Sequence, residues 1–154
     1  MNIEILFLGK TKEAYLQQGI EDFAKRLSQF NAIELVDIKV KKQSGTELQI
    51  RSYESSLLEK RITSGSYRVV VDGRGRQLSS EGLAGFITKL ENRAVKTLSF
   101  IIGGPVGLAE DQREKADTML ALSQMTFTHD MARLILLEQL YRAFTIKAGT
   151  RYHK

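Results

Sequence analysis

The sequence has no cysteine, one proline and only two histidines among its 154 residues. Without cysteine the chain has no disulfide bonds, thiol catalysis or thiolate metal sites. His129 and His153 alone are too few for a histidine-rich metal centre, so we expect no metal cofactor. Disulfide, thiol and histidine-metal chemistry are therefore excluded from the expected function.

Long hydrophobic runs are also missing. No apolar run is long enough to span a bilayer, and the chain enters Ile3-Glu4-Ile5 without the basic and apolar regions of a signal peptide. We therefore expect a cytoplasmic protein with no membrane contact. The length suits one domain with its own core, over residues 1–154.

The net charge is +5 at pH 7, which favours a polyanionic partner. No aromatic RNA-binding strand, zinc-finger spacing or basic zipper accompanies the charge, so it points only weakly to nucleic acid. A basic cluster, Lys39, Lys41 and Lys42, is interpreted either as a solvated loop or as an RNA contact. If RNA binds, we expect the protein to contact mostly its phosphates and to recognise its shape rather than its bases.

Apolar runs typical of strands alternate with amphipathic helical patterns. Strands are expected at residues 3–8, 33–40, 67–72 and 98–102, and a strong last helix at 131–148. Residues 122–127 are half strand and half loop in character. The alternation, repeated five times, predicts an α/β fold with a parallel sheet and helices on both faces.

Several local features qualify this outline. Thr11 is a possible cap of the first helix, Ser44-Gly45-Thr46-Glu47 fits a capping box, and Leu48 should share an inner helix face with Leu58. The aromatic stripe of the first helix reads as core, and part of it also suits a dimer contact. Residues 73–76 (Gly-Arg-Gly-Arg) suit either a flexible loop over an anion or a solvated turn.

The strand at 98–102 stops at Gly103-Gly104-Pro105 and Gly107. This pattern is neither the dinucleotide fingerprint nor the P-loop. It reads either as a tight turn from strand to helix or as a ligand site, because ligands in open α/β sheets bind beyond the carboxyl ends of the strands. Near the C-terminus, Glu138 and Arg142 have the spacing of a helical ion pair. The tail carries Tyr152, His153 and Lys154.

These motifs, taken together, resemble the ribosomal RNA large subunit methyltransferase H family over essentially the whole chain. The resemblance rests on the glycine turn, on Leu122-Ser123 with Met125-Thr126-Phe127, and on the closing Tyr152-His153-Lys154. It departs from the family at Thr128, where proline is common. The resemblance implies a SPOUT-type methyltransferase with a C-terminal trefoil knot, acting as a homodimer with S-adenosylmethionine. The implied reaction methylates N3 of pseudouridine 1915 in 23S rRNA on the assembled ribosome.

The resemblance also implies where the site residues lie. Arg142 and His153 are the expected catalytic residues, with the arginine stabilising an anion and the neutral histidine accepting a proton. The tail is expected to reach the partner subunit's pocket. The residues expected to bind the nucleotide are His129, Arg133, Tyr152 and Lys154, and those expected to bind the cofactor are Val71, Gly103, Leu122, Ser123, Gln124, Met125, Thr126 and Phe127.

A different class of function stays open: a non-catalytic RNA-binding or ribosome-associated factor on an α/β scaffold. That alternative explains the charge but neither the glycine turn nor residues 122–127. A nucleotide hydrolase is less favoured, because the chain has neither a P-loop nor an evident metal cluster.

Overall fold

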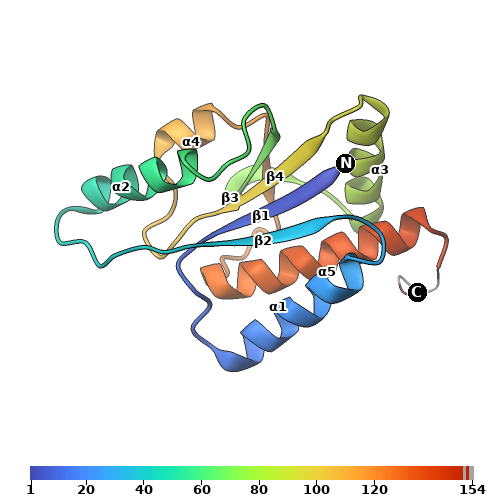
Figure 1. Cartoon of the computed structure of the whole chain (residues 1–154), viewed down its shortest axis with the longest axis horizontal. Coiled ribbons are helices and arrows are strands. Elements are labelled where there is room, and N and C mark those ends of the chain that lie inside the picture. Colours follow the sequence, from blue (N-terminus) through green and yellow to red (C-terminus); the bar gives the residue numbers. More distant parts are fainter. Residues whose placement is uncertain (151, 153–154) are drawn as a thin grey trace.

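The computed structural model describes residues 1–150 and 152, which form one five-stranded parallel sheet in the order β2-β1-β4-β3-β5 (Figure 1). The strands are β1 (Asn2–Leu8), β2 (Ile33–Ile38), β3 (Tyr67–Gln77), β4 (Thr97–Ile102) and β5 (Thr118–Ala121). The helices are α1 (Ala14–Leu27), α2 (Glu47–Glu59), α3 (Ser80–Asn92), α4 (Glu110–Glu114) and α5 (His129–Lys147).

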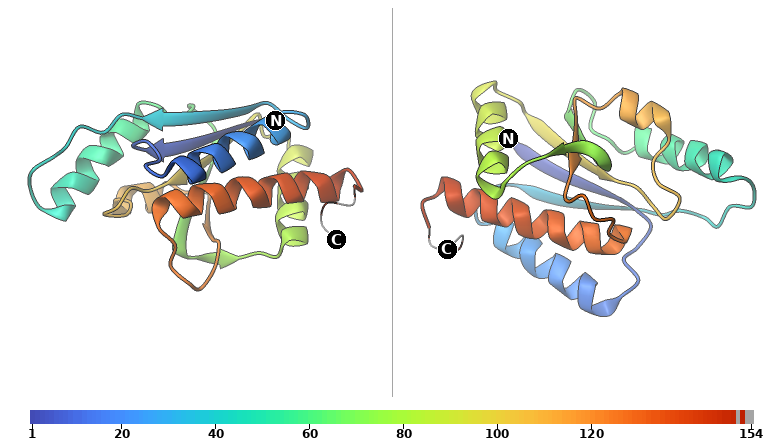
Figure 2. Two further views of the ribbon diagram at one scale, coloured as in Figure 1. Left: turned by 90° about the horizontal axis from the view of Figure 1, so that it is seen from below. Right: turned by 180° about the vertical axis from the view of Figure 1, so that it is seen from behind.

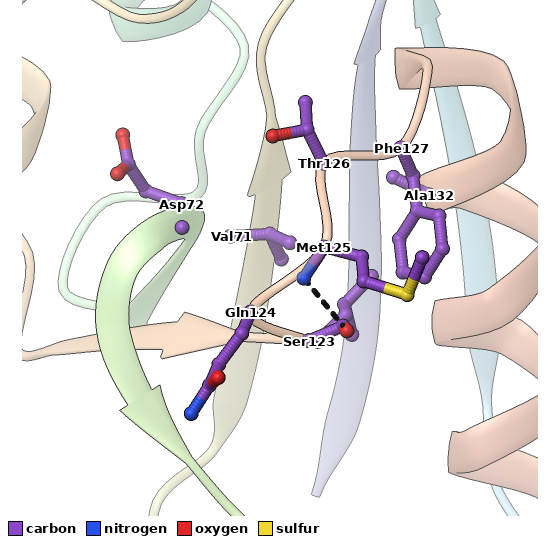
Figure 3. A pocket seen from close by; sticks show the side chains of 10 residues that line it. Val71, Asp72, Ser123, Gln124, Met125, Thr126, Phe127 and Ala132 are labelled. Atoms are coloured by element: carbon purple, nitrogen blue, oxygen red, sulfur yellow. Dashed lines mark hydrogen bonds between the residues drawn. The ribbon is translucent and has the colours of Figure 1, made fainter.

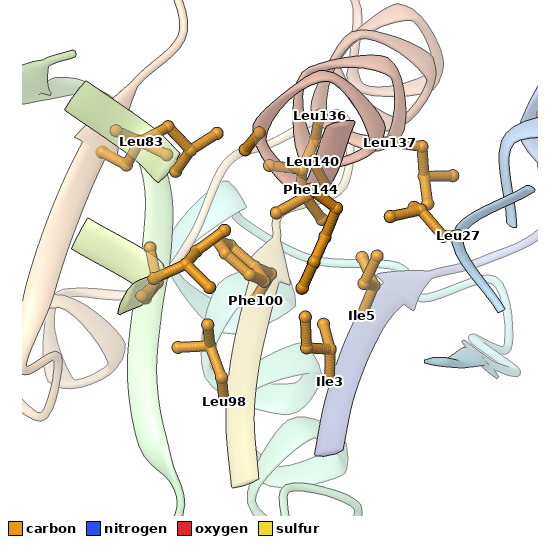
Figure 4. Packing of buried hydrophobic residues seen from close by; sticks show 14 of the residues in the cluster. Ile3, Ile5, Leu27, Leu83, Leu98, Phe100, Leu136, Leu137, Leu140 and Phe144 are labelled. Atoms are coloured by element: carbon orange, nitrogen blue, oxygen red, sulfur yellow. The ribbon is translucent and has the colours of Figure 1, made fainter. Parts of the chain in front are cut away.

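Helices cover both faces of the sheet, as predicted (Figure 2). Because side chains alternate along a strand, Ile3 and Ile5 of β1 face α1, α3 and α5, whereas Leu6 faces α2. Figure 4 shows the larger core, where residues such as Phe100 of β4 meet Leu136 and Leu140 of α5. Burying a side chain of this kind stabilises the fold by about 1.5–3 kcal/mol.

Several predicted boundaries move in the structure. The expected strand at 33–40 ends at Ile38, and α5 begins two residues earlier than predicted because the Thr128 side chain caps it, accepting a hydrogen bond from the Met131 N–H at 3.2 Å. The expected cap of α1 by Thr11 is wrong, since Glu13 holds that position without a side-chain bond.

The second helix differs from the prediction at two points. Its capping box consists of Thr46 and Gln49 rather than Ser44 and Glu47. Leu48 is 74% exposed, so it does not share the inner face with Leu58. Leu58 itself is fully buried against the sheet, as expected.

The largest correction concerns residues 73–76, which belong to β3 rather than to a free loop. Val71 and Arg76 both align with Leu120 of β5, so residues 72–75 bulge out of the line of the strand and return to it. Gly75 lies so close to β5 that a Cβ there would be 2.5 Å from the Leu120 nitrogen. Only glycine allows this approach of two main chains.

Among the helices of the described part of the chain, none has both the length and the apolar character needed to cross a membrane.

Candidate active site

A cleft lies beside the bulge of β3 and beyond the carboxyl ends of β4 and β5, where the sequence indicated a candidate ligand site. It consists of two adjoining hollows of about 190 and 440 Å³. Both hollows are lined by Val71, Asp72, Phe127 and Ala132. The smaller hollow adds residues 122–126 (Figure 3), and the larger adds Gly103, Gly104, Pro105 and His129. All eight residues expected to bind the cofactor therefore line one cleft.

The glycine turn forms one wall. A Cβ at Gly103 would be 3.0 Å from the Leu108 Cγ and 3.2 Å from main-chain atoms of Gly107 and Leu108, so a larger residue there would push the wall out of place. The turn closes through a hydrogen bond from the Gly107 N–H to the Gly104 carbonyl at 3.0 Å. Gly107 adopts φ +77°, which favours glycine. The sequence thus specifies a rigid main-chain wall.

Residues 122–127 form the opposite wall and fold back on themselves. The Met125 N–H donates to the Ser123 hydroxyl at 3.0 Å, the bond drawn in Figure 3. Met125 is 75% exposed and Phe127 is 36% exposed, although both are large and apolar. Apolar side chains left open at a cleft favour an apolar ligand surface such as an aromatic ring.

Asp72 is the ionised group of the cleft. Burial alone would raise its pKa, but the Arg74 N–H donates to its carboxylate at 2.9 Å and the Arg113 Nε at 2.8 Å. These bonds lower the pKa of Asp72 to about 2. Arg74 and Arg113 are thus held by acidic partners, which disfavours the idea that Arg74 reaches over a bound anion.

His129 opens α5 and lines the larger hollow. Burial lowers the pKa of His129, and nearby Arg133 and Lys12 lower it further against the opposing effect of Asp130. Its Nε2 lies 3.2 Å from the Asp130 Oδ1. The imidazole is therefore mainly neutral at pH 7.

Comparison with known proteins decides the family. The sequence model described as "Predicted SPOUT methyltransferase" matches residues 1–153. Proteins named "Ribosomal RNA large subunit methyltransferase H" are 44% identical in Desulfotalea psychrophila, over all of both chains, and 42% identical in Geobacter metallireducens, over 99% of both. The chain belongs to the SPOUT methyltransferase family.

Solved structures agree with this SPOUT methyltransferase fold. A probable methylase family protein from Haemophilus influenzae has a TM-score of 0.57 at 14% identity, covering 99% of this chain and 70% of its own. A probable methyltransferase from Bordetella pertussis has the same TM-score at 12% identity, covering 93% and 96%. At such low identity these structures support the fold alone.

Arg133, expected to seat the nucleotide, is buried in this SPOUT methyltransferase, with 0% exposure. Its guanidinium donates to the Leu8 carbonyl at 2.9 Å and to the Thr11 hydroxyl at 3.0 Å, and lies 4.7 Å from the centre of the Phe7 ring. The Asp130 Oδ1 lies 3.2 Å from the Arg133 Nη1. These contacts tie α5 to the end of β1 and to the loop that follows it.

Arg142 and Tyr152 lie together but far from the cleft. Arg142 donates to the Glu138 carboxylate at 3.1 and 2.6 Å, and its guanidinium is 5.1 Å from the centre of the Tyr152 ring. Because a helix rises 1.5 Å per residue, Arg142 stands about 20 Å along α5 from His129. Figure 1 shows this end of α5 beside the C-terminus. His153 and Lys154 lie outside the described residues.

The sequence interpretation missed two residues that shape the cleft. Asp72 was overlooked although it is the last residue of the strand expected at 67–72, a position that could have singled it out. Ala132 lies one helical turn after Thr128 and presents only a methyl group to both hollows. No sequence signal distinguishes that alanine from any other helical alanine.

Proposed function

We propose that this protein transfers a methyl group from S-adenosylmethionine to N3 of pseudouridine 1915 in 23S rRNA, within the assembled ribosome. The observation that carries the proposal is the cleft, whose walls are the main chain of the bulge in β3 and of the segments that follow β4 and β5. Relatives at 35–44% identity named ribosomal RNA large subunit methyltransferase H support rRNA as the substrate. Work on ribosomes implies a cytoplasmic location.

The cleft suits the donor in size and chemistry. The apolar side chains of Val71, Leu122 and Phe127 would pack against the adenine ring, and the main chain of Gly103 and of residues 122–127 would supply hydrogen bonds to its polar edge. Among the described residues no group of three or more acidic or histidine side chains is arranged to hold a metal ion. When bound, the donor supplies a methyl group on a positively charged sulfur.

The reaction is an in-line displacement in which the N3–C bond forms as the C–S bond breaks, so the protein mainly positions the reactants. N3 must give up its proton, and in our proposal the His153 imidazole accepts it. Arg142 would stabilise the anion that develops on the base. Tyr152, Lys154 and His129 would seat the nucleotide.

We further propose that the active site is completed by a second copy of the chain. Arg142 stands about 20 Å along α5 from the end that lines the cleft, and Tyr152 lies beside Arg142, so one copy cannot bring these two residues to a methyl group held in its own cleft. Tyr15 on α1 is 67% exposed and Phe30, just after α1, is 37% exposed, which leaves aromatic surface for a partner. In a symmetric dimer each tail would serve the other subunit's cleft.

Mixing two inactive variants tests this arrangement. Gly103→Leu should damage the cleft and Arg142→Ala the nucleotide end, so each variant alone should lose methylation. After subunit exchange at equal amounts, half of the dimers would hold one intact composite site, and activity should return to about a quarter of the wild-type value. No recovery, with dimer exchange verified, would show that both groups act within one chain.

We also propose that the C-terminal segment forms the trefoil knot typical of SPOUT proteins. Support comes from the bulge of residues 72–75, which leaves β3 and returns to it while β5 passes against Gly75. In the proposed knot, the chain that follows β5 would pass through the loop that residues 72–75 form beside that strand. An experimental structure in which residues 122–128 pass outside that loop would contradict the knot.

Two measurements test the function itself. Calorimetry should give a saturable heat with S-adenosylmethionine, and Gly103→Leu should abolish it while Gly85→Ala, on α3 outside the cleft and with nothing within 4 Å of the new Cβ, should retain it. Mass spectrometry of rRNA should then find one added methyl group after incubation with ribosomes from a strain that lacks the gene. A protein that binds ribosomes but gives no heat with the donor would instead be the non-catalytic RNA-binding factor.

A further inference from the structure

Five exposed lysines gather where β1 and β2 end. Lys10 and Lys12 follow β1, and Lys39, Lys41 and Lys42 follow β2. Parallel pairing of Leu8 with Ile38, and a hydrogen bond from the Gly9 N–H to the Ile38 carbonyl at 2.8 Å, hold the two loops side by side. We call these residues the lysine surface.

The lysine surface adjoins the cleft. The Lys12 N–H donates to the Asp130 Oδ2 at 3.0 Å, which ties the first loop to the start of α5 beside His129. Strand β1 also pairs with β4, whose next residues form the glycine wall. An RNA strand that runs across the carboxyl ends of β2, β1 and β4 would therefore lead from these lysines into the cleft.

Their charges are free, unlike those of the arginines around the same cleft. Arg74 and Arg113 pair with Asp72, and Arg51 pairs with Glu47. None of the five lysines forms an ion pair with any residue in the described part of the chain. The acidic Asp37 near the end of β2 interacts electrostatically with the buried guanidinium of Arg133, not with one of the five lysines in an ion pair. Positive charge without a partner is suited to an external polyanion.

We propose that the lysine surface binds the phosphate backbone of the rRNA that flanks the target nucleotide. The proposal rests on the function proposed above and adds where the substrate is held. Lysine side chains act as flexible point charges that contact phosphates without reading bases. Recognition of the modified position would then come from the fold of the rRNA, while these contacts hold it over the cleft.

Charge reversal tests this surface with a matched control. The triple variant K39E/K41E/K42E changes the lysine surface, and K60E/K89E/K96E makes the same change of charge on exposed lysines at the opposite ends of the strands. Binding to unmodified ribosomes is measured by filter retention over a range of potassium chloride. We expect the first variant to bind at least about tenfold more weakly than wild type and the second to stay within about threefold.

The salt dependence separates RNA from other partners. For each phosphate that the variant no longer neutralises, the slope of log affinity against log salt should become shallower by about 0.7–0.9. Equal binding by both triple variants would overturn the proposal. So would weaker binding by the first variant with an unchanged salt slope, which would indicate a protein contact.

The experiment measures binding to ribosomes and not methylation. Its result therefore tests the lysine surface whether or not the wild type modifies pseudouridine. Calorimetry with S-adenosylmethionine should give wild-type affinity for K39E/K41E/K42E, and loss of that affinity would mean that the substitutions damage the fold or the cleft and would overturn the assignment to RNA.

Discussion

Glu54 of α2 lies beneath the glycine wall and is only 5% exposed. Its Oε2 has no hydrogen-bond partner in the described structure, and its Oε1 lies 3.4 Å from the position of a Cβ on Gly104. Burial raises the pKa of Glu54 because no described group compensates the charge. The buried acid therefore opposes folding once it is ionised.

We predict that Glu54→Gln stabilises the protein at pH 8 by about 1 kcal/mol. The folded state holds the Glu54 proton more tightly than the unfolded state does. Wild-type stability is therefore lost as pH rises above the ordinary carboxyl range, and the gain should vanish near pH 4. Urea unfolding at both pH values checks this, with exposed Glu114→Gln as the control. A gain that is larger at pH 4 would contradict the account.

Arg133 is the second residue whose burial determines its role. Arg133→Met should lower the free energy of unfolding by about 3–5 kcal/mol, because it leaves the Asp130 carboxylate buried without its cation. Adding Asp130→Asn removes that unpaired charge and should restore part of the loss. Thermal and urea unfolding of the single and double variants measure both effects. A double variant less stable than Arg133→Met would show that the pair does not act in this way.

At the scale of elements, β3 and β5 meet with almost no space between their main chains. Gly75→Ala should cost about 3 kcal/mol, because the new methyl group meets the Leu120 main chain at 2.5 Å. Gly73→Ala is the control within the same bulge, since nothing lies within 4 Å of a Cβ there. Urea unfolding compares the two. Equal stability of both variants would mean that the two strands separate without penalty.

The sequence predicted the element order well but not the crossing of β3 and β5. Residues 98–102 are mostly apolar without alternation, which predicts a strand buried on both faces of the sheet. In the structure they form β4, which lies in the middle of the sheet. Alternating glycine and arginine at 73–76 reads locally as a loop. It is held as strand only by pairing with β5, more than forty residues later. Pairing over such distances leaves no local pattern.

The core side of α5 shows a second limit. Leu136, Leu137 and Leu140 are all fully buried, although Leu136 and Leu137 are adjacent in the sequence and do not share one narrow face of the helix. Apolar residues occur all around this helix because it packs against the sheet, α1 and α3, so the 3.6-residue period identifies no single face. Every predicted cofactor residue lines the cleft, since strand ends can be read from sequence. The burial of Arg133 could not be read, because a charged residue in a helix ordinarily faces solvent.

At the scale of the whole molecule, assembly is the main expectation. We predict that the wild type sediments as a dimer at micromolar concentration and that Tyr15→Glu, on the exposed aromatic surface of α1, shifts it to monomer. Leu48→Glu, at an equally exposed apolar residue on the helix covering the other face, should leave the dimer intact. Analytical ultracentrifugation distinguishes the two. Dimer loss by Leu48→Glu alone would assign the contact to α2.

Helix α5 begins at the cleft and carries Arg142 in its last two turns, where Tyr152 lies against it, so the cleft and this pair of residues are held rigidly apart. With the proposed dimer, dilution would affect the two activities differently. A separated subunit would keep its affinity for the methyl donor but could not carry out turnover. The reaction rate would then fall with the square of protein concentration at high dilution. At such concentrations a single subunit would bind the donor but would transfer its methyl group only after it met a second subunit.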